Sequence, residues 1–207
     1  MSSQSITIDL WTDIACPWCY IGETIFELSK SSFLSLHPST TITTIIHSYM
    51  IDPSTKPEGE DYLSYNKRRW GSDSWTIQLK EIGKQIGCNF KNWKIWANTL
   101  KAHMLLQESK KFGKEDEIIF DLYRLSYEEG KNISNENVLN DLAKKYELKE
   151  WNNESNKMKV FEEDQIGKNK FDIHGVPMFI FKETGRKIEG ADEPKKFVYE
   201  MELALKK

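Results

Sequence analysis

Two cysteines, Cys16 and Cys19, are separated only by Pro17 and Trp18 and form a C-x-x-C motif. Three cysteines scattered at random over 207 residues would produce such a pair in only about 4% of chains. A thiolate is the species that attacks disulfides, and a second thiol within one helical turn can resolve the mixed disulfide that forms. The spacing therefore indicates thiol–disulfide exchange, with zinc binding and chance pairing as the alternatives.

Zinc binding is the main competing interpretation of the motif. Structural zinc needs four ligands, usually supplied by a second C-x-x-C or by a pair of histidines. The other candidates in this chain are Cys88 and four dispersed histidines. Cys88 follows Gly87 and is expected to be a lone free thiol. We therefore expect no metal and no organic cofactor.

The composition argues against several classes of function. The net charge is −3 and the sequence pI is about 5.9, so no electrostatic footprint for nucleic acid or an anionic membrane appears. No run of 18 apolar residues occurs, and residues 1–5 lack the basic and apolar regions of a secretory signal. We expect a cytoplasmic protein, in which a structural disulfide framework is uncommon.

The motif lies between an expected strand and an expected helix. Residues 6–11 alternate apolar and polar side chains, and apolar residues follow Cys19 at helical spacing. The first cysteine would then face the unpaired N–H groups and the dipole of a helix N-terminus, which favour a thiolate. Pro17 suits the first helical turn. A β-rich run at residues 41–46 completes a β-α-β unit.

A long helical block is expected after this unit. Its helices are predicted over about residues 75–86, 93 or 98 to 112, 116–129, 134–146 and 155–171. Residues 175–182 then form an apolar segment preceded by glycine and proline, which predicts a strand. A turn leads to a partner strand at 187–189 and a last helix at 193–205. The outer parts therefore have the order β-α-β followed by β-β-α.

This order resembles a thioredoxin fold interrupted by a helical domain, which is the DsbA-like arrangement. Within it, the chain is similar to the FrnE-type branch of DsbA-family oxidoreductases. The most specific segments are C-P-W-C-Y-I-G and G-V-P-M-F, and the others support them. The matching segments are residues 13–22, 52–53, 57–62, 98–103, 130–133, 175–179 and 190–191.

One departure from the family pattern concerns Met104, where the family often has arginine. A sister branch, which includes kappa-class glutathione transferases and 2-hydroxychromene-2-carboxylate isomerases, lacks the C-x-x-C and usually has serine there. The presence of both Cys16 and Cys19 favours the oxidoreductase branch.

The resemblance implies an α/β fold with a central mixed sheet and an all-helical insertion. We predict that residues 1–56 and 151–207 form the two parts of the thioredoxin fold. Residues 57–150 are predicted to form the helical insertion domain.

The resemblance also assigns roles in the site. Cys16 is expected to be the nucleophile and Cys19 the resolving thiol. Pro177 is expected to be cis and to face the motif, although an arbitrary X-Pro bond is cis in only about 5–6% of cases. The backbone of Val176 would pair with the substrate chain. Further substrate contacts are expected from Pro17, Trp18 and Met178.

Several polar residues have both a functional and a structural interpretation. Asp13 lies three positions before the motif and either accepts a proton from the resolving thiol or caps the loop. His103 and Asn98, on an expected helix, either face the active-site groove and bind substrate or are satisfied interior residues. His174 is expected near the site, and His47 is expected to be structural.

We therefore expect a protein-disulfide oxidoreductase or isomerase that exchanges disulfides with protein or small thiol substrates, as a monomer or a homodimer. Glutathione is an additional candidate co-substrate. Two alternatives stay open. One is a glutathione-dependent transferase or isomerase that uses Cys16 alone and survives Cys19→Ser. The other is a redox-inactive, chaperone-like binding protein.

Overall fold

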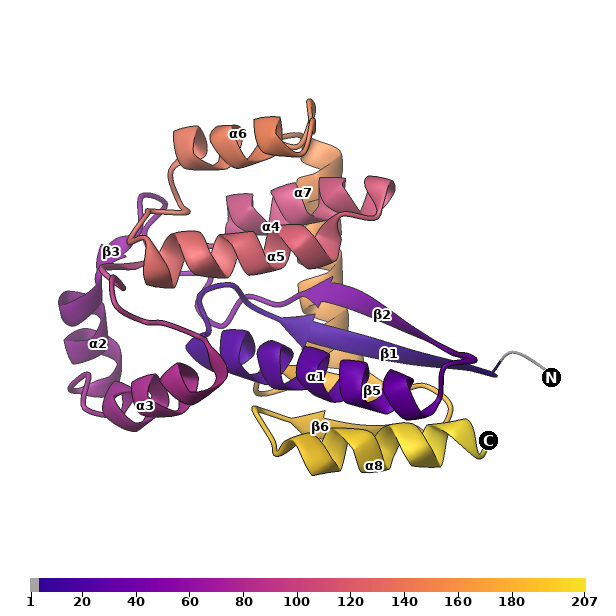
Figure 1. The fold of residues 1–207 in the computed structure, drawn as a ribbon. Helices are drawn as coiled ribbons and strands as arrows, with labels where there is room; N and C mark the ends of the chain where they lie inside the picture. Colours follow the sequence, from indigo (N-terminus) through magenta and orange to yellow (C-terminus); the bar gives the residue numbers. More distant parts are fainter. Residues whose placement is uncertain (1–3) are drawn as a thin grey trace.

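The computed structural model of the protein describes residues 4–207 (Figure 1). Strand β1 (Gln4–Thr12) and strand β2 (Thr40–Ser48) are parallel neighbours joined by helix α1 (Pro17–Leu36). This is the predicted β-α-β unit. The first three residues, where the predicted N-terminal part begins and where no secretory signal was expected, lie outside the described residues.

The C-terminal segment completes the sheet. Strand β5 (Met178–Phe181) pairs antiparallel with β1, and strand β6 (Arg186–Glu189) pairs antiparallel with β5. The strand order is β2-β1-β5-β6, so the central sheet is mixed, as expected. Helix α8 (Pro194–Leu205) follows and packs against α1.

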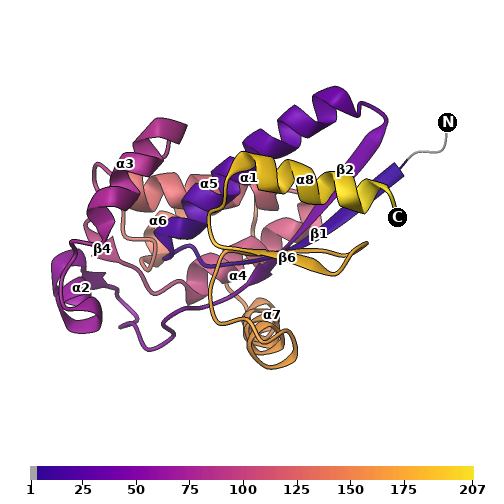
Figure 2. The same ribbon diagram turned by 90° about the horizontal axis from the view of Figure 1, so that it is seen from below.

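Helices cover both faces of this sheet. Figure 2 shows α1 and α8 on one face, and helix α7 (Glu154–Gln165) on the other. Helix α7 contacts β2 and also helix α4 (Leu100–Ser109), so it links the sheet to the helical segment. Because α7 contacts both the sheet and the helical segment, these contacts do not mark where one part ends and the next begins. The division into residues 1–56, 57–150 and 151–207 stays a prediction.

The middle of the chain is mostly helical, as expected, and lies at one side and one end of the sheet (Figure 1). A two-stranded ribbon joins β3 (Glu60–Asp61) to β4 (Ile95–Trp96). None of the helices within residues 4–207 is both long and apolar enough to cross a membrane. Besides α4, the segment contains α2 (Tyr62–Trp70), α3 (Thr76–Ile86), α5 (Glu115–Tyr123) and α6 (Glu136–Lys145).

Helix α2 was missed because its sequence is strongly polar and buries only a few side chains. Its limits nevertheless have clear causes. The carboxylate of Asp61 accepts a hydrogen bond from the backbone N–H of Ser64, and Gly71 ends the helix with φ of 81°.

The predicted start of one other helix and that of one strand were wrong. The helix expected from residue 93 or 98 begins at Leu100, because the preceding segment forms β4 and an irregular loop. Helices α5 and α7 continue as π-helical turns over Arg124–Glu128 and Ile166–Lys170, so the helices predicted over 116–129 and 155–171 are confirmed to within one residue at each end. The strand expected at 175–182 covers only β5, since the loop before it holds Pro177, which has no N–H to donate to the sheet.

Candidate active site

The C-x-x-C motif lies at the start of α1, as predicted. Cys16 is the N-cap residue with an extended backbone, and Pro17 is the first helical residue. The backbone N–H of Cys16 donates to the carbonyl of Asp13, and that of Cys19 donates to the carbonyl of Cys16, both at 3.0 Å. These two bonds fix the turn between the end of β1 and the helix.

The two thiols of the motif are placed asymmetrically. All three cysteines of the chain lie within the described residues and are free thiols. Cys16 retains 6% exposure and lines a cavity, whereas Cys19 is fully buried. Burial is the main cause that raises the pKa of Cys19 well above its ordinary value, and the neighbouring Cys16 thiol adds to it.

The loop before β5 faces the motif. The Val176–Pro177 peptide bond is cis, as the resemblance predicts. The carbonyl oxygen of Val176 accepts a hydrogen bond from Sγ of Cys16 at 3.4 Å. A Cβ on Gly22 would lie 2.7 Å from Cγ of Pro177, so glycine in α1 allows the loop to approach the helix.

A cavity of about 530 Å³ opens beside Cys16. One wall is the start of α1 with Pro17 and Trp18, and another is the loop from His174 to Val176. The structure therefore brings these predicted site residues together. The remaining wall is aromatic and comes largely from the helical segment, through Tyr65, Trp70, Trp75 and Trp96.

The aromatic rings of this wall pack against one another, and the guanidinium groups of Arg68 and Arg69 lie over two of them, Tyr65 and Trp70. The rings of Tyr65 and Trp96 are stacked with centroids 4.0 Å apart, and Trp70 and Trp75 meet edge to face. The guanidinium of Arg69 lies over the Trp70 ring, 4.7 Å from its centroid. The cavity thus offers apolar surface, a thiol and a positive charge.

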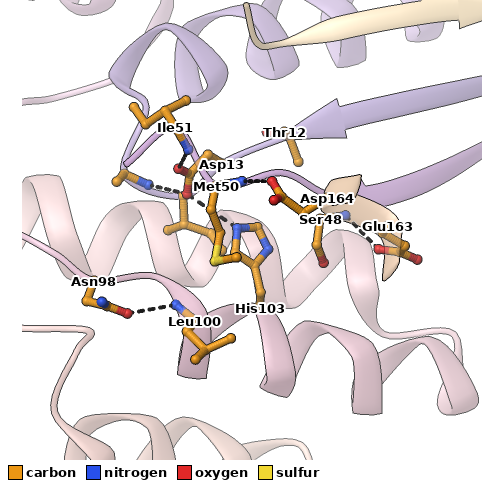
Figure 3. Close-up of polar contacts among 12 residues, drawn as sticks. Thr12, Asp13, Ser48, Met50, Ile51, Asn98, Leu100, His103, Glu163 and Asp164 are labelled. Atoms are coloured by element: carbon orange, nitrogen blue, oxygen red, sulfur yellow. Dashed lines mark hydrogen bonds and ion pairs between the residues drawn. The ribbon is translucent and has the colours of Figure 1, made fainter. Parts of the chain in front are cut away.

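Asp13 holds the loop beneath the motif (Figure 3). Its Oδ2 accepts a hydrogen bond from the N–H of Ile51 at 2.8 Å, and its Oδ1 accepts one from the N–H of Ala15. Nε2 of His103 lies 3.3 Å from Oδ1. Asp13 and His103 are both buried, so this cluster ties the loop to α4 and the segment after β2.

The other predicted site residues do not line the cavity. His103 is fully enclosed, and Met178 is buried in β5 beside Trp11. The side-chain amide of Asn98 donates to the carbonyl of Thr55, and its Oδ1 accepts the N–H of Leu100 at the start of α4 (Figure 3). Direct substrate contact by these three side chains is therefore not supported by their placement.

The other histidines and the third cysteine considered in the sequence analysis have polar contacts that explain their positions. His174 is exposed at the cavity rim and pairs with Asp172. His47 hydrogen-bonds Asp9 at 2.9 Å. The thiol of Cys88 is buried beside Thr24 and Tyr20. Among residues 4–207, no three His, Cys, Asp or Glu side chains gather as a metal site.

Glu23 is a residue of the site that the sequence reasoning missed. It lies one helical turn after Cys19 and is only 2% exposed. The phenol of Tyr123 on α5 donates to its Oε1 at 2.6 Å, and the hydroxyl of Thr12 at the end of β1 donates to the same oxygen. Burial raises the pKa of Glu23 to about 8. The sequence did contain one signal for Glu23: it is a charged residue that stands between the apolar positions of α1.

Tyr127 is a second missed residue of the site. Its hydroxyl donates to the carbonyl of Ile14 at 2.9 Å and so supports the loop that carries Cys16. Nothing in the local sequence indicates this contact, because the two residues are 113 positions apart.

Three solved structures show the same fold. A protein named as a probable DsbA oxidoreductase, from Streptomyces coelicolor, has a TM-score of 0.81 at 19% identity, covering 96% of this chain and 89% of its own. The cytosolic disulfide reductase DsbM from Pseudomonas aeruginosa, solved with GSH, has a TM-score of 0.65 at 17% identity, with coverages of 97% and 100%. A 2-hydroxychromene-2-carboxylate isomerase has a TM-score of 0.68 at 13% identity, with coverages of 95% and 94%.

Comparison with curated protein sequences finds no match. The family model for the DSBA-like thioredoxin domain, in contrast, matches residues 7–202, which is nearly the whole chain. Together with the mixed sheet, the helical segment and the cysteine pair at the start of α1, this match shows that the chain belongs to the DSBA-like thioredoxin domain family.

Proposed function

We propose that the protein is a thiol–disulfide oxidoreductase in which Cys16 attacks and Cys19 resolves. The asymmetry of the two thiols carries this proposal: Cys16 lines the cavity, whereas Cys19 lies fully buried one helical turn behind it. A substrate sulfur can reach the first thiol and not the second. Such a division is what a two-step exchange requires.

The reaction proceeds in two displacements. The Cys16 thiolate attacks one sulfur of the substrate disulfide, a Cys16–substrate disulfide forms, and the other substrate sulfur leaves as a thiolate. Cys19 then attacks Sγ of Cys16, and the second substrate thiolate leaves. The same steps run in reverse when the protein oxidises a dithiol. The electrons exchanged come only from the cysteine pair and the substrate sulfurs.

The substrates in this proposal are protein, peptide or small thiols. The Val176 backbone beside the cis-proline offers a carbonyl at the cavity edge, and Arg69 supplies a positive charge for a carboxylate. Glutathione, with two carboxylates and one thiol, is a co-substrate that suits these features. We also propose a reducing compartment such as the cytoplasm, where the pair would rest as a dithiol and favour reductase or isomerase work.

Insulin reduction and refolding of scrambled ribonuclease test the proposal. Wild type is expected to turn over in at least one of these assays, and Cys16→Ser is expected to abolish activity. Cys19→Ser should trap a mixed disulfide on Cys16. Wild-type protein without activity in either assay, or turnover that survives Cys16→Ser, contradicts the proposal.

The transferase or isomerase alternative has a separate signature. It uses Cys16 alone, so glutathione-dependent turnover would survive Cys19→Ser. Loss of all glutathione-dependent turnover in that variant argues against it.

A further inference from the structure

Glu23 is a buried carboxyl group whose surroundings contain hydroxyls and no cation. Within residues 4–207, the hydroxyls of Thr12 and Tyr123 are its side-chain hydrogen-bond partners, and Glu23 forms no ion pair with a basic side chain, unlike the buried Glu200, which pairs with Arg186. The two hydroxyl oxygens lie 2.9 Å apart, so both converge on the same carboxylate oxygen. Buried carboxyl groups normally have a cationic partner. The lack of a cationic partner for Glu23 therefore needs an explanation.

Glu23 lies close enough to Cys19 for its charge to disfavour the Cys19 thiolate. They are four positions apart on α1, so their side chains share one buried face of the helix. Beyond burial and the contacts with Cys16, the charge of Glu23 also raises the pKa of Cys19. The pKa of Tyr123 is raised by burial and then by the charges of both Glu23 and Cys19.

Other groups also face this pair. From α1, the carboxylate of Glu27 adds negative charge near Glu23, and from α5 the carboxylate of Asp116 does the same. On the side of Cys19, the backbone of Asp13 makes a hydrogen bond that favours the thiolate. Tyr127 on the π-helical turn after α5 also feels the charge of Cys19. The pair is therefore a site where one negative charge is tolerated and two are disfavoured.

Asp13 is the competing proton acceptor, and its oxygens are already in use. They accept the N–H groups of Ile51 and Ala15 and lie beside His103. These contacts hold the loop in place and would have to weaken if Asp13 took up a proton. Glu23 has only hydroxyl donors, which can rotate when the carboxylate becomes a carboxyl group.

We propose that Glu23 accepts the proton of Cys19 when Cys19 resolves the mixed disulfide on Cys16. This inference rests on the proposed thiol–disulfide activity. The Glu23 carboxylate takes the thiol proton, and the Cys19 sulfur forms a bond to Sγ of Cys16. The bond between Cys16 and the substrate sulfur breaks, and the substrate leaves with the electron pair as a thiolate. In the opposite direction, the Glu23 carboxyl group returns the proton to Cys19 as it leaves.

The strength of this base suits the task. Burial raises the pKa of Glu23 to about 8, whereas an ordinary glutamate at 4.5 is too weak a base for a thiol. General acid–base catalysis is most efficient when the pKa of the group lies near the working pH. The resolution rate should therefore rise with pH and level off near pH 8.

The test follows resolution directly, on the full-length protein. Cys16 is loaded with a nitrobenzoate thiol from the corresponding aromatic disulfide, and the coloured thiolate released by Cys19 is followed in a stopped-flow instrument from pH 5 to pH 10. We expect the wild-type rate to show the inflection near pH 8. Glu23→Gln should lose this inflection and resolve at least about tenfold more slowly at pH 7.

Glu200→Gln is the matched control, because Glu200 on α8 is an equally buried carboxylate and is paired with Arg186 on β6. It should keep the wild-type profile. An unchanged inflection in Glu23→Gln, or its loss in Asp13→Asn instead, overturns the role of Glu23. Absence of a second release in the wild type contradicts the thiol–disulfide function itself.

A second variant covers the case in which Glu23→Gln does not fold. Thr12→Val removes a hydroxyl that donates to the Glu23 carboxylate and lowers the pKa of Glu23. We expect the inflection of the resolution rate to move to higher pH. An unmoved inflection in this variant also overturns the proposal, since a purely structural carboxyl group would not set the pH profile.

Discussion

Two carboxyl groups, the buried Glu23 and the partly buried Glu163, approach the sheet from opposite faces and have opposite properties. Glu23 on α1 accepts a hydrogen bond from Thr12, at the end of β1. Glu163 on α7 accepts one from the backbone N–H of Ser48, which is the register partner of Thr12 on β2. The two groups therefore lie at the same level of the molecule, beside helices on different faces (Figure 2).

The partners of Glu163 are cationic or are fixed N–H donors. Nζ of Lys110 donates to its Oε1 at 2.8 Å, and Nδ1 of His47 lies 3.8 Å from the same oxygen. Burial opposes ionisation, but the contacts with His47, Lys110 and the Ser48 N–H outweigh it and hold the pKa of Glu163 at about 2. Glu163 stays ionised and links α7 to α4 and β2.

The comparison teaches that burial alone does not decide the state of a carboxyl group. At Glu163 the surrounding charges compensate for burial, and the group stabilises the fold. At Glu23 the surroundings leave burial uncompensated, and the group can gain and lose a proton near neutral pH. A residue that costs stability beside a reactive thiol is what a functional role predicts.

The largest expected effect concerns Glu23 and the pH dependence of stability. The folded state retains a proton on Glu23 between pH 4.5 and about pH 8, whereas the unfolded state loses it at the lower value. The free energy of unfolding should therefore fall as pH rises through this window, by at most about 5 kcal/mol. Urea titrations at several pH values measure it.

Glu23→Gln sharpens the comparison because glutamine does not titrate. We expect the variant to lose this pH-dependent decline and to be more stable than the wild type at pH 8, while resolving mixed disulfides more slowly. A variant that is less stable than the wild type at pH 8 would show that the Glu23 side chain serves packing and not proton transfer.

Glu163→Gln should have a smaller effect of the opposite sign. Its carboxylate contributes stability above pH 4.5 that is lost as pH falls through about 2. At pH 7 the variant leaves Lys110 without its charge partner, and we expect it to lose about 2–3 kcal/mol of unfolding free energy. Differential scanning calorimetry and urea titration measure this loss.

Glu162→Gln provides the control for that experiment. Glu162 is the exposed neighbour on the same helix, so the substitution should change stability by less than about 0.5 kcal/mol. Equal stability of the two variants at pH 7 would contradict the compensated state of Glu163.

The sequence predicted the elements that have strong local signals. The helix over residues 75–86 is periodic and ends at Gly87, which has φ of 90° in the left-handed region. Helix α2 also ends at a glycine, Gly71, but it lacks a periodic apolar pattern because its buried residues are few and its sequence is strongly polar. The π-helical turns after α5 and α7 extend each helix without any change in composition, so a pattern of apolar residues does not distinguish them.

The residues of the candidate site likewise fall into those that a sequence motif predicts and those that it does not. Cys16, Cys19 and Pro177 belong to motifs, and the motif placed them at the start of α1 and in the facing loop. His103 and Asn98 also belong to a matching segment, yet a segment match does not say which face of a helix is turned inward. The state of Glu23 depends on a tyrosine 100 positions away, and this contact has no local signal.

The smallest expected effect is a difference between phenylalanine variants of the two tyrosines that support the site, Tyr123 and Tyr127. The phenol of Tyr123 donates to Glu23, whereas that of Tyr127 donates to the Ile14 carbonyl. Each phenylalanine variant loses one buried hydrogen bond, so both should lose about 1 kcal/mol of unfolding free energy. Only Tyr123→Phe removes a group that lowers the pKa of Glu23, and so only this variant should extend the pH-dependent decline in stability beyond pH 8. If Tyr127→Phe extends it equally, the Tyr123 hydroxyl does not set the ionisation of Glu23, and the contrast with Glu163 comes only from the charged partners that Glu163 has and Glu23 lacks.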